Sequence, residues 1–90
     1  MENSKEFNQA VKIVEKLKTK PSNEELGNLY KYYKQATVGD VNKDKPNFIY
    51  FKEAAKWDAW NSVKGLSKHN CEVEYIKLVN NFIKTYGLNK

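Results

Sequence analysis

Residues 22–40, SNEELGNLYKYYKQATVGD, contain a complete set of helix signals. Ser22 followed three residues later by Glu25 is typical of a capping box, in which each side chain bonds the other residue's backbone N–H. Gly39 and Asp40 provide a stop at the other end. Between these signals, apolar and aromatic side chains recur at helical spacing, so the stretch predicts an amphipathic helix whose stripe is Leu26, Leu29, Tyr30, Tyr33 and Thr37.

An earlier segment shows the same spacing from Phe7 to Leu17. The polar run Lys18–Pro21 ends it, because the residue before a proline avoids the helical region. We therefore expect a first helix before the capping box, and a long loop over residues 40–49 after the second helix.

Two more helices are predicted in the second half of the chain. The third runs from residue 49 or 50 to Ser62, with Phe51, Ala55 and the segment 57–60 facing neighbours. The fourth begins after an N-cap at Ser67 and ends at Gly87, a left-handed C-cap. No long strand-like alternation occurs, so the prediction is an all-α four-helix fold in a single domain over residues 1–90.

Composition limits the class of protein. The chain is 40% apolar and 30% charged, which is ordinary for a soluble globular domain. No apolar run approaches the roughly 20 residues that span a membrane, and the polar N-terminus lacks a signal-peptide core, so a cytoplasmic location is expected. The net charge of +5 comes from sixteen lysines without arginine, which argues against major-groove reading but suits a discrete phosphate.

Catalytic and metal-binding signals are weak. Cys71 is the single cysteine and His69 the single histidine, which excludes a disulfide framework and leaves too few soft ligands for zinc. The sequence has no Gly-rich phosphate loop and no recognisable catalytic triad spacing. We expect no catalytic residue, no metal site, no cofactor and no enzymatic activity.

Tyrosines and lysines form the candidate binding patch. Tyr30, Tyr33 and Lys34 share one face of the second helix, and Lys56 lies in the next helix. Flat rings beside positive charges suit a phosphate-bearing ring compound. The expected core aromatic and aliphatic residues are Phe7, Leu29, Trp57 and Phe82, while Tyr75 could belong to the core or to the site.

Several long motifs resemble the acyl-CoA-binding protein family. They are Leu17–Pro21, Tyr30–Asp40, Phe51-Lys52, Lys56–Asn61 and Tyr86-Gly87, and the likeness runs without evident gaps from Phe7 to Gly87. The resemblance implies an up-down-down-up four-helix bundle that binds medium- and long-chain fatty acyl-CoA thioesters non-covalently.

The resemblance also implies roles for individual residues. Tyr30, Lys34 and Lys56 would hold the 3′-phosphate of CoA. The adenine and ribose would contact Tyr33 and Tyr75, with Lys52 nearby. The acyl chain would lie between the first two helices, near Phe7, Val11, Leu26 and Gly27.

Two positions depart from the family pattern. Glu15 stands where the family usually has a basic residue near the 3′-phosphate, and Lys12, Lys16 or Lys20 would have to compensate. Gly27 stands where a large apolar residue usually lines the acyl groove. Because glycine leaves space there, we expect this protein to accept different or longer chains.

Two other functions compete with acyl-CoA carriage. Lysines interleaved with aromatic residues, and a pI near 9.3, would also suit a non-specific nucleic-acid binder, whose affinity falls with salt. A helical interaction module would expose an apolar patch. The preferred interpretation is a monomeric carrier with a fatty acyl-CoA ligand, no nucleic acid, and transient contacts with acyl-CoA-using enzymes and membrane surfaces.

Overall fold

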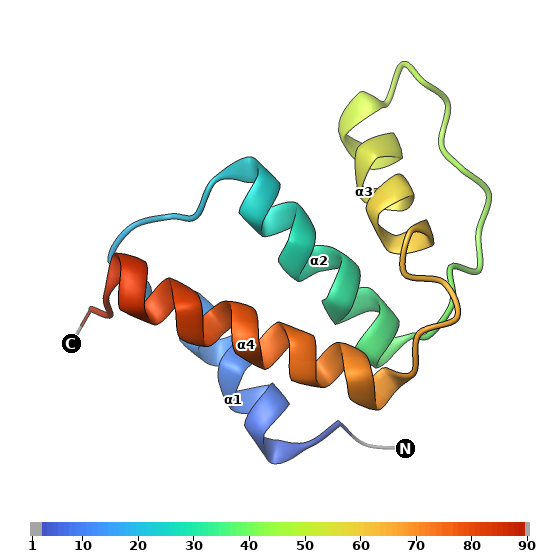
Figure 1. Ribbon diagram of the computed structural model, residues 1–90. Coiled ribbons are helices and arrows are strands. Elements are labelled where there is room, and N and C mark those ends of the chain that lie inside the picture. Colours follow the sequence, from blue (N-terminus) through green and yellow to red (C-terminus); the bar gives the residue numbers. More distant parts are fainter. Residues whose placement is uncertain (1–2, 90) are drawn as a thin grey trace.

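The computed structural model describes residues 3–89 and confirms the all-α four-helix fold (Figure 1). The helices are α1 (Lys5–Val14), α2 (Asn23–Thr37), α3 (Phe51–Asn61) and α4 (Lys68–Tyr86). Within the described residues there is no strand, only an isolated antiparallel bridge between Leu17 and Leu88. None of the helices described is long and apolar enough to cross a membrane.

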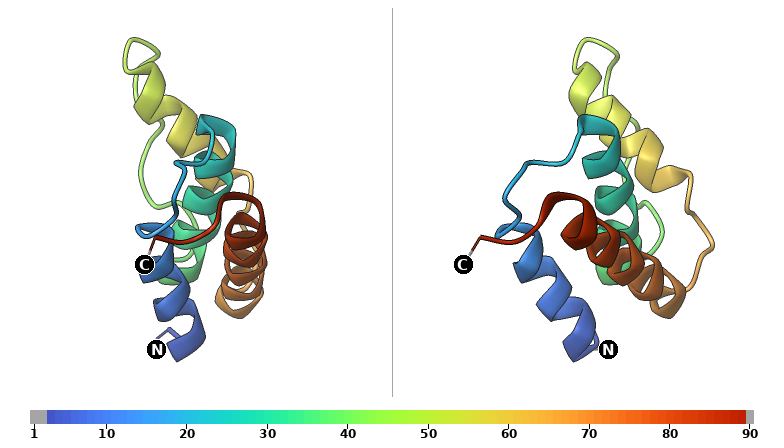
Figure 2. Two further views of the ribbon diagram at one scale, coloured as in Figure 1. Left: turned by 90° about the vertical axis from the view of Figure 1, so that its left-hand side faces the viewer. Right: turned by 60° about the vertical axis from the view of Figure 1, so that its left-hand side comes forward.

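The helices are arranged around α2 and α4. One side of α2 packs against α4 and another packs against α3, while α1 packs against α4. Figures 1 and 2 show α1 and α3 at opposite ends of a flat molecule, with extents of 40 × 32 × 15 Å. The backbones of α1 and α2 do not come into contact with each other.

Serine caps explain where three of the helices begin. The predicted capping box is present: Ser22 Oγ accepts from Glu25 N at 3.1 Å, and Ser22 N donates to Glu25 Oε1 at 2.9 Å. Ser67 Oγ accepts from Asn70 N at 3.0 Å, which confirms the predicted cap of α4. Ser4 caps α1 in the same way. Each such cap stabilises the fold by about 1 kcal/mol.

The ends of α1 and α4 differ from the prediction. α1 ends at Val14, three residues before Leu17, because the following chain pairs with the C-terminal segment. Lys18 N donates to Gly87 O at 3.0 Å, and Asn89 N donates to Lys16 O at 2.8 Å. Gly87 has the expected positive φ of 75°, but its ψ of 171° is extended, since the chain turns away to make this pairing.

The core confirms three of the four predicted residues. Phe7, Leu29 and Phe82 are buried, but the expectation that Trp57 is a core residue was wrong. Trp57 is half-buried and Trp60 is only 2% exposed. The reason is that α3 packs against α2 alone, so only one narrow side of α3 is covered.

The start of α3 is also more exposed than expected. Phe51 and Ala55 were expected to face neighbours, yet both are exposed, Phe51 by 70%. The N-terminal end of α3 projects to the edge of the molecule, where no other helix covers it (Figure 1).

A buried amide joins the two long connections. Gln35 Nε2 donates to Asp40 Oδ1 at 2.7 Å and to Leu66 O at 3.0 Å. Asp40 Oδ1 also accepts from Gly65 N at 2.8 Å, and this backbone bond is the main reason why the pKa of Asp40 is lowered. These bonds join the end of α2 to the α2–α3 loop and to the α3–α4 connection.

Candidate ligand-binding site

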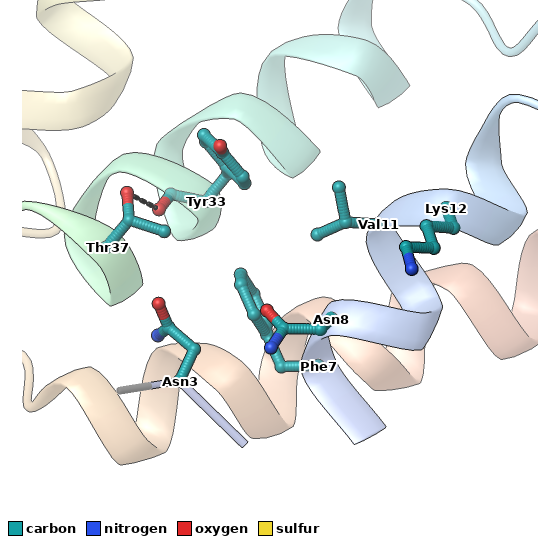
Figure 3. Close-up of a pocket in the computed structure, with 7 residues that line it drawn as sticks. All are labelled: Asn3, Phe7, Asn8, Val11, Lys12, Tyr33 and Thr37. Atoms are coloured by element: carbon teal, nitrogen blue, oxygen red, sulfur yellow. Dashed lines mark hydrogen bonds between the residues drawn. The ribbon is translucent and has the colours of Figure 1, made fainter. Parts of the chain in front are cut away.

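Cavities flank α2 on two sides. The α1–α2 cavity has a volume of about 390 Å³ and is lined by Asn3, Phe7, Asn8, Val11, Lys12, Tyr33 and Thr37 (Figure 3). The α2–α3 cavity has a volume of about 550 Å³ and is lined by Asn23, Leu26, Gly27, Tyr30, Phe51, Lys52, Ala55, Lys56 and Ala59. The two cavities therefore lie on two faces of α2, one toward α1 and the other toward α3.

Three aromatic rings from three helices meet beside the α1–α2 cavity. The ring centroids of Phe7 and Tyr75 lie 5.0 Å apart, and those of Phe7 and Tyr33 lie 6.1 Å apart. Tyr75 is only 4% exposed, and burial raises the pKa of its hydroxyl to about 12. Tyr33 is 39% exposed and presents its ring to the cavity (Figure 3). Tyr75 therefore packs behind Phe7 and Tyr33 without lining the cavity, and the exposed ring of Tyr33 is the surface on which a planar ring could stack.

Polar side chains complete the α1–α2 cavity. Asn3 Nδ2 donates to Ala36 O at 2.8 Å and to Glu72 Oε2 at 2.9 Å, and Ser4 N donates to the same Glu72 oxygen at 2.8 Å. Glu72 is 8% exposed, so a buried carboxylate anchors the segment before α1. This anchor fixes the helix that carries Phe7. The cavity thus combines aromatic walls with amide, hydroxyl and lysine groups.

The α2–α3 cavity is more apolar, with its charges at the rim. Leu26 and Gly27 line it from α2, while Ala55 and Ala59 line it from α3. A Cβ atom added to Gly27 would meet nothing within 4 Å, so the glycine leaves open space. Such a surface suits a flexible apolar chain.

Tyr30 and Lys56 face each other across the two helices. Lys56 Nζ lies 5.7 Å from the centroid of the Tyr30 ring, which is a cation–π distance. Burial, with a smaller effect from Glu53, raises the pKa of the Tyr30 hydroxyl. That hydroxyl therefore stays protonated and able to donate a hydrogen bond to an anion.

The candidate lysines have free charges. Lys34 Nζ lies 4.8 Å from the centroid of the Trp60 ring and lines neither cavity itself. Over residues 3–89 the ion pairs are Lys45–Asp58 and Lys77–Glu74. Lys34, Lys52 and Lys56 thus have no carboxylate of residues 3–89 within 4.0 Å and can attract a phosphate. No cluster of three metal-ligating side chains occurs in this part of the chain.

The structure brings some predicted site residues together and separates others. Tyr30, Lys52 and Lys56 meet at the α2–α3 cavity, and Tyr33 meets Tyr75 beside the other one. The four predicted groove residues divide into two pairs. Phe7 and Val11 line the α1–α2 cavity, whereas Leu26 and Gly27 line the α2–α3 cavity.

Sequence reasoning missed several cavity residues. Asn8 and Lys12 are four residues apart on α1, and Val11 lies between them. This spacing could have predicted that the three side chains share one face of the helix. Asn3 and Glu72 had no such signal, because their contact joins residues 69 positions apart.

The family follows from comparison with known proteins. The family model described as Acyl CoA binding protein matches residues 4–79. The chain belongs to the acyl-CoA-binding protein family. This confirms the resemblance found in the sequence. The members of this acyl-CoA-binding protein family are binding proteins and not enzymes, which also confirms the expectation of a non-catalytic role.

Individual acyl-CoA-binding proteins are similar over most of their length. The acyl-CoA-binding protein of Saccharomyces cerevisiae is 48% identical over 81 residues, which cover 90% of this chain and 93% of that protein. The crystal structure of ACBP from Moniliophthora perniciosa has a TM-score of 0.84 and 42% identity, covering 89% of this chain and 79% of that one. The solution structure of the yeast protein has a TM-score of 0.75 and 48% identity, covering 93% and 98% of the two chains.

Proposed function

We propose that this protein is a cytoplasmic, monomeric carrier that binds fatty acyl-CoA thioesters non-covalently, buffers their concentration and delivers them to acyl-CoA-using enzymes. One observation carries the proposal: a polar, aromatic cavity and an apolar cavity lie on two faces of the same helix, α2. Tyr33 lines the first cavity, and Tyr30, Lys52 and Lys56 line the second. A ligand with a charged nucleotide at one end and an acyl chain at the other would use both.

The proposed phosphate site is Tyr30, Lys34 and Lys56. Tyr30 and Lys34 share one face of α2, and Lys56 comes from α3 over the Tyr30 ring. Two lysines close to a partly dry surface attract the 3′-phosphate of CoA more strongly than they would in open water. Lys52, at the same rim, would add charge for the remaining phosphates.

The proposed site for adenine and ribose is the α1–α2 cavity. Tyr33 offers an exposed ring there, with Phe7 and Tyr75 packed beside it, and Val11 supplies apolar contact. Lys12 lines this cavity and is the lysine best placed to offset the acidic Glu15. The polar groups of this cavity suit the nucleotide better than a hydrocarbon.

The proposed acyl site is the α2–α3 cavity, beside Leu26 and Gly27. The family resemblance implied a groove between the first two helices for the chain, but the α2–α3 cavity has the more apolar lining. Shielding about twelve methylenes contributes roughly 10 kcal/mol before the costs of association, at about 0.8 kcal/mol per CH₂. Affinity should therefore need both ends of the ligand.

Isothermal titration calorimetry tests this function with three ligands in parallel: myristoyl-CoA, free CoA and free myristate. We expect tight one-to-one binding of the thioester and much weaker binding of either part. Equal, weak binding of all three would contradict a two-ended site and would leave only the family fold.

A further inference from the structure

The segment that enters α3 exposes four consecutive large apolar side chains. Phe48 is 83% exposed, Ile49 64%, Tyr50 60% and Phe51 70%. We call residues 48–51 the aromatic tip. They lie at the outer end of α3, far from α1 and α4 (Figure 1). Single exposed apolar residues are normal, but a contiguous group of this kind marks an interaction surface.

Hydrogen bonds to Asn47 order the backbone that carries the aromatic tip. Ile49 N donates to Asn47 Oδ1 at 3.1 Å, and Tyr50 N donates to Asn47 O at 2.9 Å. Trp57 Nε1 donates to Lys43 O at 2.7 Å, which fastens the preceding loop to α3. These bonds order the backbone of the segment that carries the four exposed side chains.

Lysines stand on both sides of the aromatic tip. Residues 43–58 contain four lysines and three carboxylates, of which Lys45 and Asp58 form an ion pair at 3.1 Å. Lys43, Lys52 and Lys56 remain, against Asp44 and Glu53, on a chain whose net charge is +5. Apolar side chains flanked by lysines are complementary to the interface of an anionic bilayer, where rings sit at headgroup depth and ammonium groups meet phosphates.

The tip is continuous with the proposed ligand site. Phe51 and Lys52 line the α2–α3 cavity and also a shallow hollow of about 370 Å³ formed by residues 49–53. A surface in contact with the tip would therefore lie beside the proposed acyl site. Acyl-CoA thioesters are amphiphiles whose chains enter bilayers. From a bilayer in contact with the tip, the chain would therefore have only a short path to the proposed acyl site.

We propose that the aromatic tip is a docking surface for anionic lipid bilayers, through which the protein loads or unloads its ligand. This purpose rests on the proposed function, whereas docking itself needs no ligand. A second copy of the chain fits the surface less well. A stable protein interface takes about 800 Å² and 20–30 residues from each partner, and the tip offers four side chains.

Vesicle co-sedimentation without ligand tests the proposal. The probes are phosphatidylcholine vesicles with and without phosphatidylserine, and the variant is Phe48→Ser combined with Ile49→Ser. Both residues lie outside the two cavities. We expect the wild type to bind the anionic vesicles and the double variant to lose binding by about tenfold or more, because apolar insertion supplies much of the affinity. The matched control is Val73→Ser, an exposed apolar residue on α4, which should bind like the wild type.

Calorimetry with myristoyl-CoA separates this proposal from the proposed function. The double variant should keep the wild-type affinity for the thioester. Equal vesicle binding by wild type and double variant, or no binding by the wild type, would overturn the docking surface without affecting ligand binding. Concentration-dependent dimerisation that the double variant abolishes would instead assign the tip to a second copy, and would also overturn the proposal.

Discussion

Gly27 lies inside a helix, where glycine is the weakest helix former after proline. Its position beside the α2–α3 cavity, with nothing within 4 Å of an added Cβ, gives the residue a role in the size of that cavity. Helical glycine costs about 1 kcal/mol relative to alanine. The chain thus keeps a destabilising residue in the lining of the proposed acyl site, where it leaves open space.

Substitution of Gly27 should separate stability from chain-length preference. Gly27→Ala should raise the free energy of unfolding by up to about 1 kcal/mol and leave ligand preference nearly unchanged. Gly27→Leu fills the open space and should weaken binding of the longest acyl-CoA chains more than that of short ones. Calorimetry across a series of chain lengths measures this, and an unchanged preference in the leucine variant would refute the role of the glycine.

The proposed phosphate site makes a separate prediction. Lys34→Ala and Lys56→Ala should each weaken myristoyl-CoA binding by about tenfold or more, equivalent to about 1.4 kcal/mol, because each removes a charge that meets phosphate. Lys84→Ala, at the far end of α4, is the control. Circular dichroism should show unchanged helix content in all three. Wild-type affinity in both test variants would remove the site assignment.

The hydroxyl of Tyr75 should lose its proton only at a pH well above the usual pKa of tyrosine. Burial raises its pKa from 10.0 to about 12, so the folded state holds this proton more tightly than the unfolded state does. The resulting stability is complete below pH 10 and is lost as the pH rises from 10 to 12. In a titration with base, the absorbance of tyrosinate should show a step near pH 12 that the Tyr75→Phe variant lacks. A Tyr75→Phe titration identical to the wild type would contradict the burial of the Tyr75 hydroxyl.

At the scale of elements, the starts of α2 and α4 were predicted best, because their capping residues could be recognised in the sequence. Ser22 with Glu25, and Ser67, act through residues three positions away, so their geometry can be predicted from sequence alone. The end of α1 could not be predicted, because pairing between Leu17 and Leu88 joins distant segments. The choice of Trp60 over Trp57 as the buried ring likewise depends on which side of α3 meets α2.

The anchor of α1 can be tested through Glu72. Glu72→Ala removes the acceptor of Asn3 Nδ2 and Ser4 N, and should lower the free energy of unfolding by about 1–3 kcal/mol. Glu72→Gln keeps one carbonyl acceptor and should lower the free energy of unfolding by a smaller amount. Urea unfolding measures both. Because α1 carries Phe7, we also expect weaker binding of free CoA to the alanine variant; no change in either quantity would contradict the anchor.

At the scale of the whole molecule, the site depends on spacing between helices. Sequence motifs predicted which side chains would bind, but the grouping of Phe7 with Val11 and of Leu26 with Gly27 on two faces of α2 required the packed structure. Helical spacing places residues on a face, and it does not say which neighbouring helix faces them. The family resemblance supplied the ligand class, and the cavities supply the proposed path of the ligand.

The most direct test is amide chemical-shift mapping by NMR, with myristoyl-CoA and free CoA added in turn. We expect the thioester to shift amides on both sides of α2, around Asn8 and Tyr33 and around Gly27 and Ala55. Free CoA at saturation should shift the first group and leave Gly27 and Ala55 largely unchanged. Thioester-induced shifts confined to the α1–α2 side would contradict the proposal that the acyl chain lies between α2 and α3.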